Sequence, residues 1–157
     1  MVHVLFVCLG NICRSPMAEA VFMHMVRSHG LDAEIVADSA GTGSWHLGEP
    51  PHPGTRGILG TKGITFDHRA RLLTVEDLDR FDYIVTMDEQ NFEDVKKLGP
   101  SRARVSRFLD FSPTVNRRDV PDPYYSGGYG EVYQLIEPAA EGLFAEICRE
   151  HGLDNRT

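Results

Sequence analysis

The chain has 157 residues and a formal net charge of −7 at pH 7, and its lysines and arginines form no cluster. This length is typical of one domain, so we expect residues 1–157 to fold as a single domain, and the acidic balance argues against a nucleic-acid-binding face. No apolar run approaches the ~20 residues of a membrane span, and the first residues lack the pattern of a signal peptide.

The first third of the chain predicts a strand, a helix and a second strand. Residues 2–7 are a continuous apolar run, typical of a strand covered on both faces. Ser15 and Pro16 suit a helix start, apolar residues recur at helical spacing after them, and Gly30 suits the helix end. Residues 34–38 predict the second strand, which completes a βαβ unit.

The rest of the chain continues this alternation. Further elements are expected at residues 55–60 (helix), 74–78 (helix), 83–87 (strand), 88–97 (helix) and 105–109 (strand). Residues 112–130 predict a long functional loop, and residues 129–150 predict a helix that Pro138 should kink or split. We therefore predict an α/β fold, an open parallel four-stranded sheet with helices on both faces, with ligands bound beyond the carboxyl ends of the strands.

The segment from Cys8 to Ser15 joins the first strand to the first helix and predicts an anion site. A helix N-terminus offers unpaired N–H groups and partial positive charge, and a turn with Gly10 and Asn11 can point more amides inward. Arg14 can place two donors on a phosphate. The same groups favour a thiolate at Cys8, and the Ser15 hydroxyl can donate to the sulfur. We expect Cys8 to attack a phosphate that this loop holds.

The run from Val7 to Pro16, VCLGNICRSP, closely resembles the signature of low-molecular-weight protein tyrosine phosphatases. The resemblance continues in SAGT at residues 39–42, HRAR at residues 68–71 and DPYY at residues 122–125. It implies a cysteine-based phosphatase with Cys8 as nucleophile and Arg14 as phosphate ligand. It also implies a phosphate-binding loop of Leu9, Gly10, Asn11, Ile12, Cys13 and Ser15, with Asn11, Ser15, Ser39 and His68 holding its shape.

Two aspartates of the long loop can supply the proton that an aryl leaving group needs. Asp122 matches the family's acid position and is preferred, and Asp119 is the alternative. Trp45, Tyr124 and Tyr125 are expected to form the walls of a pocket for a phenyl ring. Such walls favour phosphotyrosine, because phosphoserine is too short to reach a deep thiolate.

The three cysteines, Cys8, Cys13 and Cys148, also indicate a compartment. An odd number without a secretion signal favours a reducing cytoplasm. Cys13 can resolve an oxidised Cys8 as a disulfide, which the resemblance supports, or can be a small buried filler. Cys148 is interpreted as a core residue. The histidines show no ligand spacing, so we expect no metal site, and we expect no cofactor.

Several functions on this fold stay open. Arsenate reduction is disfavoured because residues 41–112 contain no cysteine for a redox relay. Phosphoarginine hydrolysis is the second alternative, although such family members tend to carry threonine where this chain has Ile12. A phosphocysteine carrier without turnover is the third, and a working acid at Asp122 would exclude it. The expected partner is a phosphotyrosine protein or a small aryl phosphate, and the expected state is a monomer.

Overall fold

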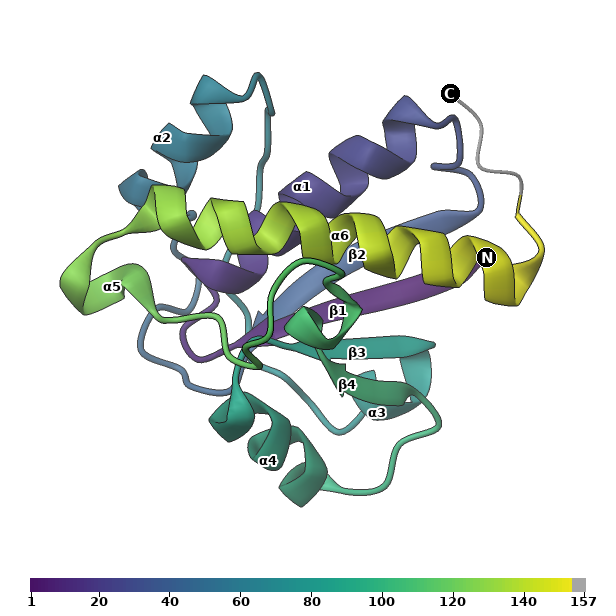
Figure 1. Cartoon of the computed structure of the whole chain (residues 1–157). Helices are drawn as coiled ribbons and strands as arrows, with labels where there is room; N and C mark the ends of the chain where they lie inside the picture. Colours follow the sequence, from purple (N-terminus) through teal and green to yellow (C-terminus); the bar gives the residue numbers. More distant parts are fainter. Residues whose placement is uncertain (154–157) are drawn as a thin grey trace.

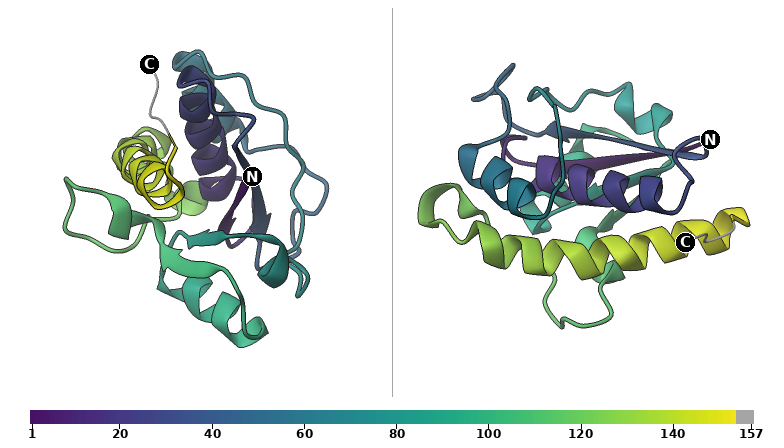
Figure 2. Two further views of the ribbon diagram at one scale, coloured as in Figure 1. Left: turned by 90° about the vertical axis from the view of Figure 1, so that its right-hand side faces the viewer. Right: turned by 90° about the horizontal axis from the view of Figure 1, so that it is seen from above.

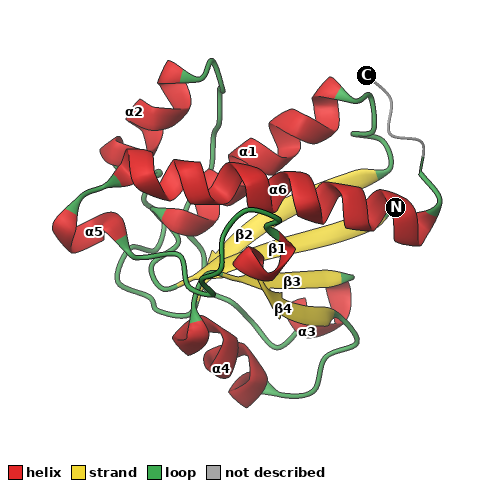
Figure 3. Cartoon of the chain, in the orientation of Figure 1, coloured by secondary structure: helices red, strands yellow, loops and turns green. Residues whose placement is uncertain are grey.

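The structure is a computed structural model that describes residues 1–153. Its centre is a sheet of four parallel strands in the order β2-β1-β3-β4 (Figures 1 and 3). The strands are β1 (Val2–Cys8), β2 (Ile35–Gly41), β3 (Tyr83–Thr86) and β4 (Arg104–Arg107). The predicted α/β fold with a parallel four-stranded sheet is therefore confirmed.

Helices cover both faces of the sheet, as Figure 2 shows from two sides. One face carries α1 and α6, and α2 packs against these two helices. The other face carries α3 and α4, which contribute Leu78 and Val95 to its core. The helices are α1 (Arg14–Ser28), α2 (Pro53–Thr61), α3 (Asp77–Arg80), α4 (Glu89–Leu98), the 3-10 helix η1 (Phe108–Phe111), α5 (Pro123–Ser126) and α6 (Tyr129–His151).

The continuous apolar run at the start of the chain forms β1, a strand that is covered on both faces. Successive side chains of a strand point to opposite faces. Val4 and Phe6 pack under α1 and α6, whereas Leu5 and Val7 pack toward α3 and α4, and all four are fully buried. A central parallel strand between two helical layers has no polar face.

Several predicted elements were wrong in detail. The second strand covers Ile35–Gly41 instead of residues 34–38, and the helix expected at residues 74–78 is α3, Asp77–Arg80. The strand expected at residues 105–109 ends at Arg107, and Phe108 begins the 3-10 helix η1. Phe108 and Leu109 are buried core residues, and a short buried apolar run does not distinguish a strand from a short helix. Pro138 does not split the last helix, because α6 runs without interruption from Tyr129 to His151. Ile136 and Ala139 are fully buried beside it, so packing holds the helix despite the missing hydrogen bond.

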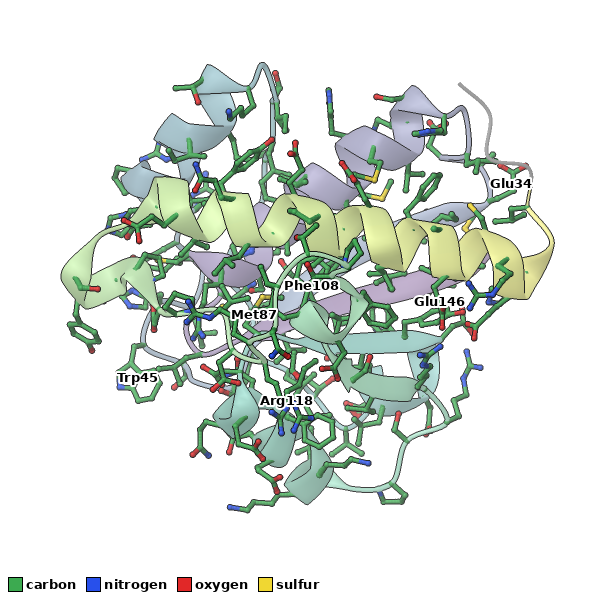
Figure 4. The ribbon with its side chains drawn as sticks, in the orientation of Figure 1. Glu34, Trp45, Met87, Phe108, Arg118 and Glu146 are labelled. Carbon is green, nitrogen blue, oxygen red and sulfur yellow. The ribbon has the colours of Figure 1, made fainter. Side chains whose placement is uncertain are left out.

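The parallel strands bring several loops to one end of the molecule. The loops after β1 and β2 and the segment before α5 meet at the carboxyl edge of the sheet (Figure 1). Trp45, from the loop after β2, lies at this end, and Glu34, just before β2, lies at the opposite end (Figure 4). Within residues 1–153, no helix has the length and apolarity that a membrane crossing requires.

Candidate active site

The loop between β1 and α1 places donors around the Cys8 sulfur. Cys8 is the last residue of β1 and is 2 % exposed. The Asn11 backbone N–H donates to Cys8 Sγ over 3.3 Å, and Ser15 Oγ lies 3.0 Å from the sulfur. Ser15 Oγ accepts a hydrogen bond from Asn11 Nδ2, so its own hydrogen is free to point at Cys8. Both donors favour a negatively charged sulfur.

The conformation of the loop depends on the side chain of Asn11. This residue is 1 % exposed and has a φ of 58°, in the left-handed region that asparagine tolerates better than most residues. Its Oδ1 accepts from the Arg71 backbone N–H at 3.0 Å and from His68 Nε2 at 2.8 Å. Its Nδ2 donates to Ser39 Oγ at 3.0 Å as well as to Ser15. Three of the four residues expected to shape the loop therefore meet on the fourth.

Glu19 extends this network and was not identified from the sequence. The Ser39 hydroxyl donates to Glu19 Oε1 over 2.7 Å. Burial raises the pKa of Glu19 to about 8, and burial lowers the pKa of His68. Glu19 follows Ser15 by one helical turn, so the two share a face of α1. The four-residue spacing from Ser15 places the Glu19 carboxyl on the mainly apolar face of α1. This pattern could have identified Glu19 from the sequence.

Arg14 begins α1 and holds a buried positive charge beside Cys8. Its Nη1 donates to Asp88 Oδ2 at 2.6 Å and to the Val120 carbonyl at 3.0 Å. Burial alone would lower the pKa of Arg14, but Cys8 and Asp88 raise it above its usual value. Its Nε is buried and has no hydrogen-bond partner among the described residues. Arg14 is thus fixed on one side and keeps a donor for another acceptor.

Asp88 has two structural roles at this site. Its Oδ1 accepts from the Asn91 backbone N–H at 2.8 Å, which caps α4, while its Oδ2 binds Arg14. One carboxylate thus ties the start of α4 to the guanidinium. The sequence contained no signal for the second contact, because 74 positions separate the two residues.

Of the two aspartates considered as the acid, only Asp122 lies in the pocket. Its Oδ2 is 3.5 Å from Arg14 Nη2, and its Oδ1 caps α5 by accepting from the Tyr124 backbone N–H at 3.1 Å. Asp119 instead accepts from the Glu89 backbone N–H at 3.1 Å and does not line the pocket. The geometry therefore favours Asp122.

A pocket of about 440 Å³ opens above the loop. Its floor is formed by Cys8, Leu9, Gly10, Ile12, Cys13 and Arg14, and its sides by Trp45, His46, Asp122, Tyr124 and Tyr125. All three aromatic residues that were expected as walls line this pocket. A Cβ atom on Gly43 would lie 1.8 Å from Trp45 Cζ3, so the indole ring rests directly on that glycine.

His46 is a wall residue that the sequence did not single out. Its ring lies 5.3 Å from that of Tyr124, and its Nδ1 is 3.2 Å from Glu49. Tyr124 in turn meets Tyr125 edge to face, with ring centres 4.9 Å apart. The entrance therefore combines flat aromatic surface with one imidazole ring.

Cys13 lies in the same loop but in different surroundings. Its Sγ is 3.5 Å from Tyr129 Oη, and its carbonyl accepts from Thr55 Oγ1 at 3.1 Å. Burial raises the pKa of the Cys13 thiol to about 11. All three cysteines are free, and Cys148 is buried as expected.

Comparison with known proteins places these features in a family. Residues 3–153 match the model of the family described as low molecular weight phosphotyrosine protein phosphatase. The chain is 49% identical over 156 residues to the low molecular weight protein-tyrosine-phosphatase YfkJ of Bacillus subtilis. The aligned region covers 98% of this chain and 100% of YfkJ.

Solved structures agree with this match. The crystal structure of YfkJ has a TM-score of 0.93 over 96% of each chain. A protein tyrosine phosphatase of Entamoeba histolytica with Hepes in its active site is 37% identical, with a TM-score of 0.90 over 97% of this chain and 99% of its own. An arginine phosphatase of Drosophila is 32% identical, with a TM-score of 0.86 over 92% of this chain and 96% of its own.

Proposed function

Because the chain belongs to the low molecular weight phosphotyrosine protein phosphatase family, and is therefore a phosphatase, we propose that it hydrolyses phosphotyrosine and other aryl phosphates through a phosphocysteine intermediate. One observation carries this proposal. The Cys8, Arg14 and Asp122 side chains line the same pocket, and Arg14 Nε has no hydrogen-bond partner within residues 1–153. They are a nucleophile, a phosphate ligand and an acid, the three parts that the reaction needs.

In the first step, the loop amides and Arg14 hold the phosphate oxygens, and the donors from Asn11 and Ser15 keep the sulfur anionic. Cys8 Sγ attacks phosphorus from the side opposite the phenolic oxygen. The S–P bond forms as the P–O bond breaks. Asp122, in its protonated form, gives its proton to the departing oxygen, which leaves as a neutral phenol.

In the second step, water attacks the phosphocysteine. Asp122, now a carboxylate, accepts the proton from that water, and the S–P bond breaks. The products are inorganic phosphate and the Cys8 thiolate, so the cycle closes without an outside reductant or metal. Asp88 and Val120 hold Arg14 in place throughout.

The walls of the pocket support an aromatic substrate. Trp45 and Tyr124 lie on the sides of the pocket, above a floor on which Cys8 is nearly inaccessible. A phenyl ring spans that depth and contacts both rings, which adds about 0.5–1.5 kcal/mol per favourable pair. A phosphoserine side chain is too short to bring its phosphorus to the sulfur while its backbone stays outside.

Phosphoarginine is the main competing substrate, because one structural relative is an arginine phosphatase. Ile12 lines the floor of the pocket and is 5 % exposed. Its apolar side chain makes the floor less suited to a guanidinium than to a phenyl ring. We expect Ile12→Thr to raise the phosphoarginine rate relative to the phosphotyrosine rate. A parent protein that prefers phosphoarginine would reverse the assignment of substrate.

The central experiment measures hydrolysis of p-nitrophenyl phosphate and a phosphotyrosine peptide in EDTA, with parent protein and Cys8→Ser. The parent protein should hydrolyse both substrates, and rapid acid quenching should trap its phosphocysteine intermediate. Cys8→Ser should show neither hydrolysis nor the intermediate. Activity that survives Cys8→Ser, or that needs added metal, would reject the mechanism. Phosphocysteine that forms without steady turnover would instead identify a carrier.

We further propose that the protein acts as a monomer in a reducing cytoplasm, where Cys8 stays a free thiol. The three free cysteines are consistent with that setting. Size-exclusion chromatography with light scattering tests the monomer, and fractionation of the source cell tests the location.

A further inference from the structure

Three side chains with ligating atoms meet behind the Cys8 loop. Glu19 of α1, Asp38 of β2 and His68 from the segment between α2 and α3 each offer one such atom, and these atoms lie within 4.8 Å of one another. The side chains of His68, Glu19 and Asp38 are 8%, 12% and 40% exposed. The cluster is therefore closed toward the protein interior and open to solvent beside Asp38.

Hydrogen bonds decide which nitrogen of His68 faces the two acids. The Arg71 backbone N–H can only donate, and it lies 3.0 Å from Asn11 Oδ1, so that atom is the amide oxygen. His68 Nε2 lies 2.8 Å from the same oxygen and therefore carries a hydrogen. In the neutral ring, Nδ1 then has a bare lone pair.

That lone pair faces the carboxyl groups of Glu19 and Asp38. His68 Nδ1 is 3.6 Å from Glu19 Oε1 and 4.0 Å from Asp38 Oδ1, and it makes no hydrogen bond with any residue in the described part of the chain. When Glu19 is deprotonated, this lone pair and the two carboxylate oxygens repel one another unless a positive charge lies between them. A cation at the centre removes this repulsion.

The donor set indicates which cation fits. An imidazole nitrogen with carboxylate oxygens suits Zn²⁺ and related transition metals, whereas Mg²⁺ and Ca²⁺ prefer oxygen ligands alone. Bonds of about 2.0–2.2 Å in a tetrahedron place ligand atoms about 3.4 Å apart. The 3.6 and 4.0 Å from His68 Nδ1 are close to that spacing.

We propose that Glu19, Asp38 and His68 bind a transition-metal dication of the Zn²⁺ type, with a water on the solvent side of Asp38 as the fourth ligand. A histidine that binds a metal usually donates its other N–H to a fixed acceptor, and Asn11 Oδ1 is that acceptor. The metal would thus fasten the residue that shapes the Cys8 loop to α1 and β2. Spacing in the sequence gave no sign of this set, because the three ligands come from separate elements.

One nearby charge limits the affinity. Arg71 Nε donates to Asp38 Oδ2 at 3.0 Å, so a guanidinium already neutralises part of the cluster. Asp38 Oδ1, the oxygen nearer to His68, accepts only from the Ser39 backbone N–H among the described hydrogen bonds. It keeps a lone pair for the metal, and the site should bind Zn²⁺ without displacing Arg71.

The test is isothermal calorimetry of Zn²⁺ titrated into the untagged Cys8→Ser, Cys13→Ser chain, in which neither loop thiolate can bind the metal. One equivalent should bind, and Mg²⁺ should give no heat. Asp38→Asn should weaken Zn²⁺ binding about tenfold or more. Asp67→Asn removes an exposed acid next to His68 but outside the cluster, and it should leave the affinity nearly unchanged.

Thermal unfolding of the same chains gives a second readout and shows whether each variant is folded. Zn²⁺ should raise the melting temperature of the double serine variant and of its Asp67→Asn derivative, but much less that of its Asp38→Asn derivative. Absence of Zn²⁺ binding up to millimolar concentration would overturn the proposal. Equal losses in Asp38→Asn and Asp67→Asn would do the same, because binding would then depend on general charge.

Discussion

Substitution of Asn11 by alanine should be among the most destabilising changes near the pocket. The side chain makes four hydrogen bonds, at 2.8 Å to Ser15 and His68 and at 3.0 Å to Ser39 and Arg71. Alanine leaves the Arg71 N–H without an acceptor, whereas the His68 Nε2–H keeps Ser39 Oγ at 3.2 Å. Each buried unsatisfied group costs about 1–3 kcal/mol.

Backbone strain adds to that cost. With a φ of 58°, position 11 disfavours a residue with an ordinary Cβ by about 1 kcal/mol. Together, the two effects predict a loss of about 2–4 kcal/mol in the free energy of unfolding of Asn11→Ala. Asn11→Gly loses the same hydrogen bonds but not the favourable backbone, so it should be about 1 kcal/mol more stable than Asn11→Ala.

Urea unfolding of the parent and both variants measures these differences, and hydrolysis of an aryl phosphate measures the site. Activity should fall about 10- to 100-fold in both variants, because the Asn11 N–H no longer points reliably at Cys8 Sγ. A loss below about 1 kcal/mol in both variants would refute the assigned hydrogen bonds. A glycine variant no more stable than the alanine variant would refute the strain.

Three further predictions follow from single contacts. Asp122→Asn keeps the cap of α5 but removes the acid, so turnover of an aryl phosphate with a poor leaving group should fall about 10²–10⁴-fold. The control variant Asp119→Asn should keep most of the activity. Equal losses in the two variants would show that Asp122 is not the acid. Burial raises the pKa of Cys13 from 9.0 to about 11, so at pH 8 iodoacetamide should alkylate Cys13 about a hundredfold more slowly in the folded than in the urea-unfolded chain. The rate in the folded chain, measured by mass spectrometry, should rise as the pH approaches 11. Similar rates in the two states would contradict a buried thiol. In α6, a Cβ on Gly142 would lie 1.8 Å from a backbone carbonyl oxygen of η1, whereas one on Gly130 meets only a side-chain carbon at 3.8 Å. Gly142→Ala should therefore lower the free energy of unfolding by about 1–3 kcal/mol or more, seen as a lower urea midpoint. Gly130→Ala should not lower the urea midpoint.

Much of the site could be predicted because it is local. The apolar run of β1, the turn with Gly10 and Asn11, and the start of α1 at Arg14 lie within one continuous stretch. Their φ/ψ preferences and periodicity are properties of neighbouring residues, so the pattern itself predicts a strand, an anion-binding turn and a helix. The same stretch carried the resemblance to the family, which the comparisons confirmed.

The contacts between distant segments depended on tertiary structure. Asp88 and Arg14 are 74 positions apart, and Val120 and Arg14 are 106 apart, so no local pattern links them. The choice between Asp119 and Asp122 required the path of the long loop, which buried contacts decide rather than turn propensity. Strand ends and pocket residues such as His46 were likewise uncertain, because burial there comes from segments brought in by the fold.

The sequence by itself therefore determined the strand–loop–helix unit and the chemistry it can perform, since backbone preferences act over a few residues. Only the tertiary structure decided which groups hold that unit in place. Glu19, Asp38 and His68 come together because α1 packs across β2 and the segment before α3 pairs with the end of that strand. Their proximity results from tertiary packing, which the spacing of these residues along the sequence does not predict.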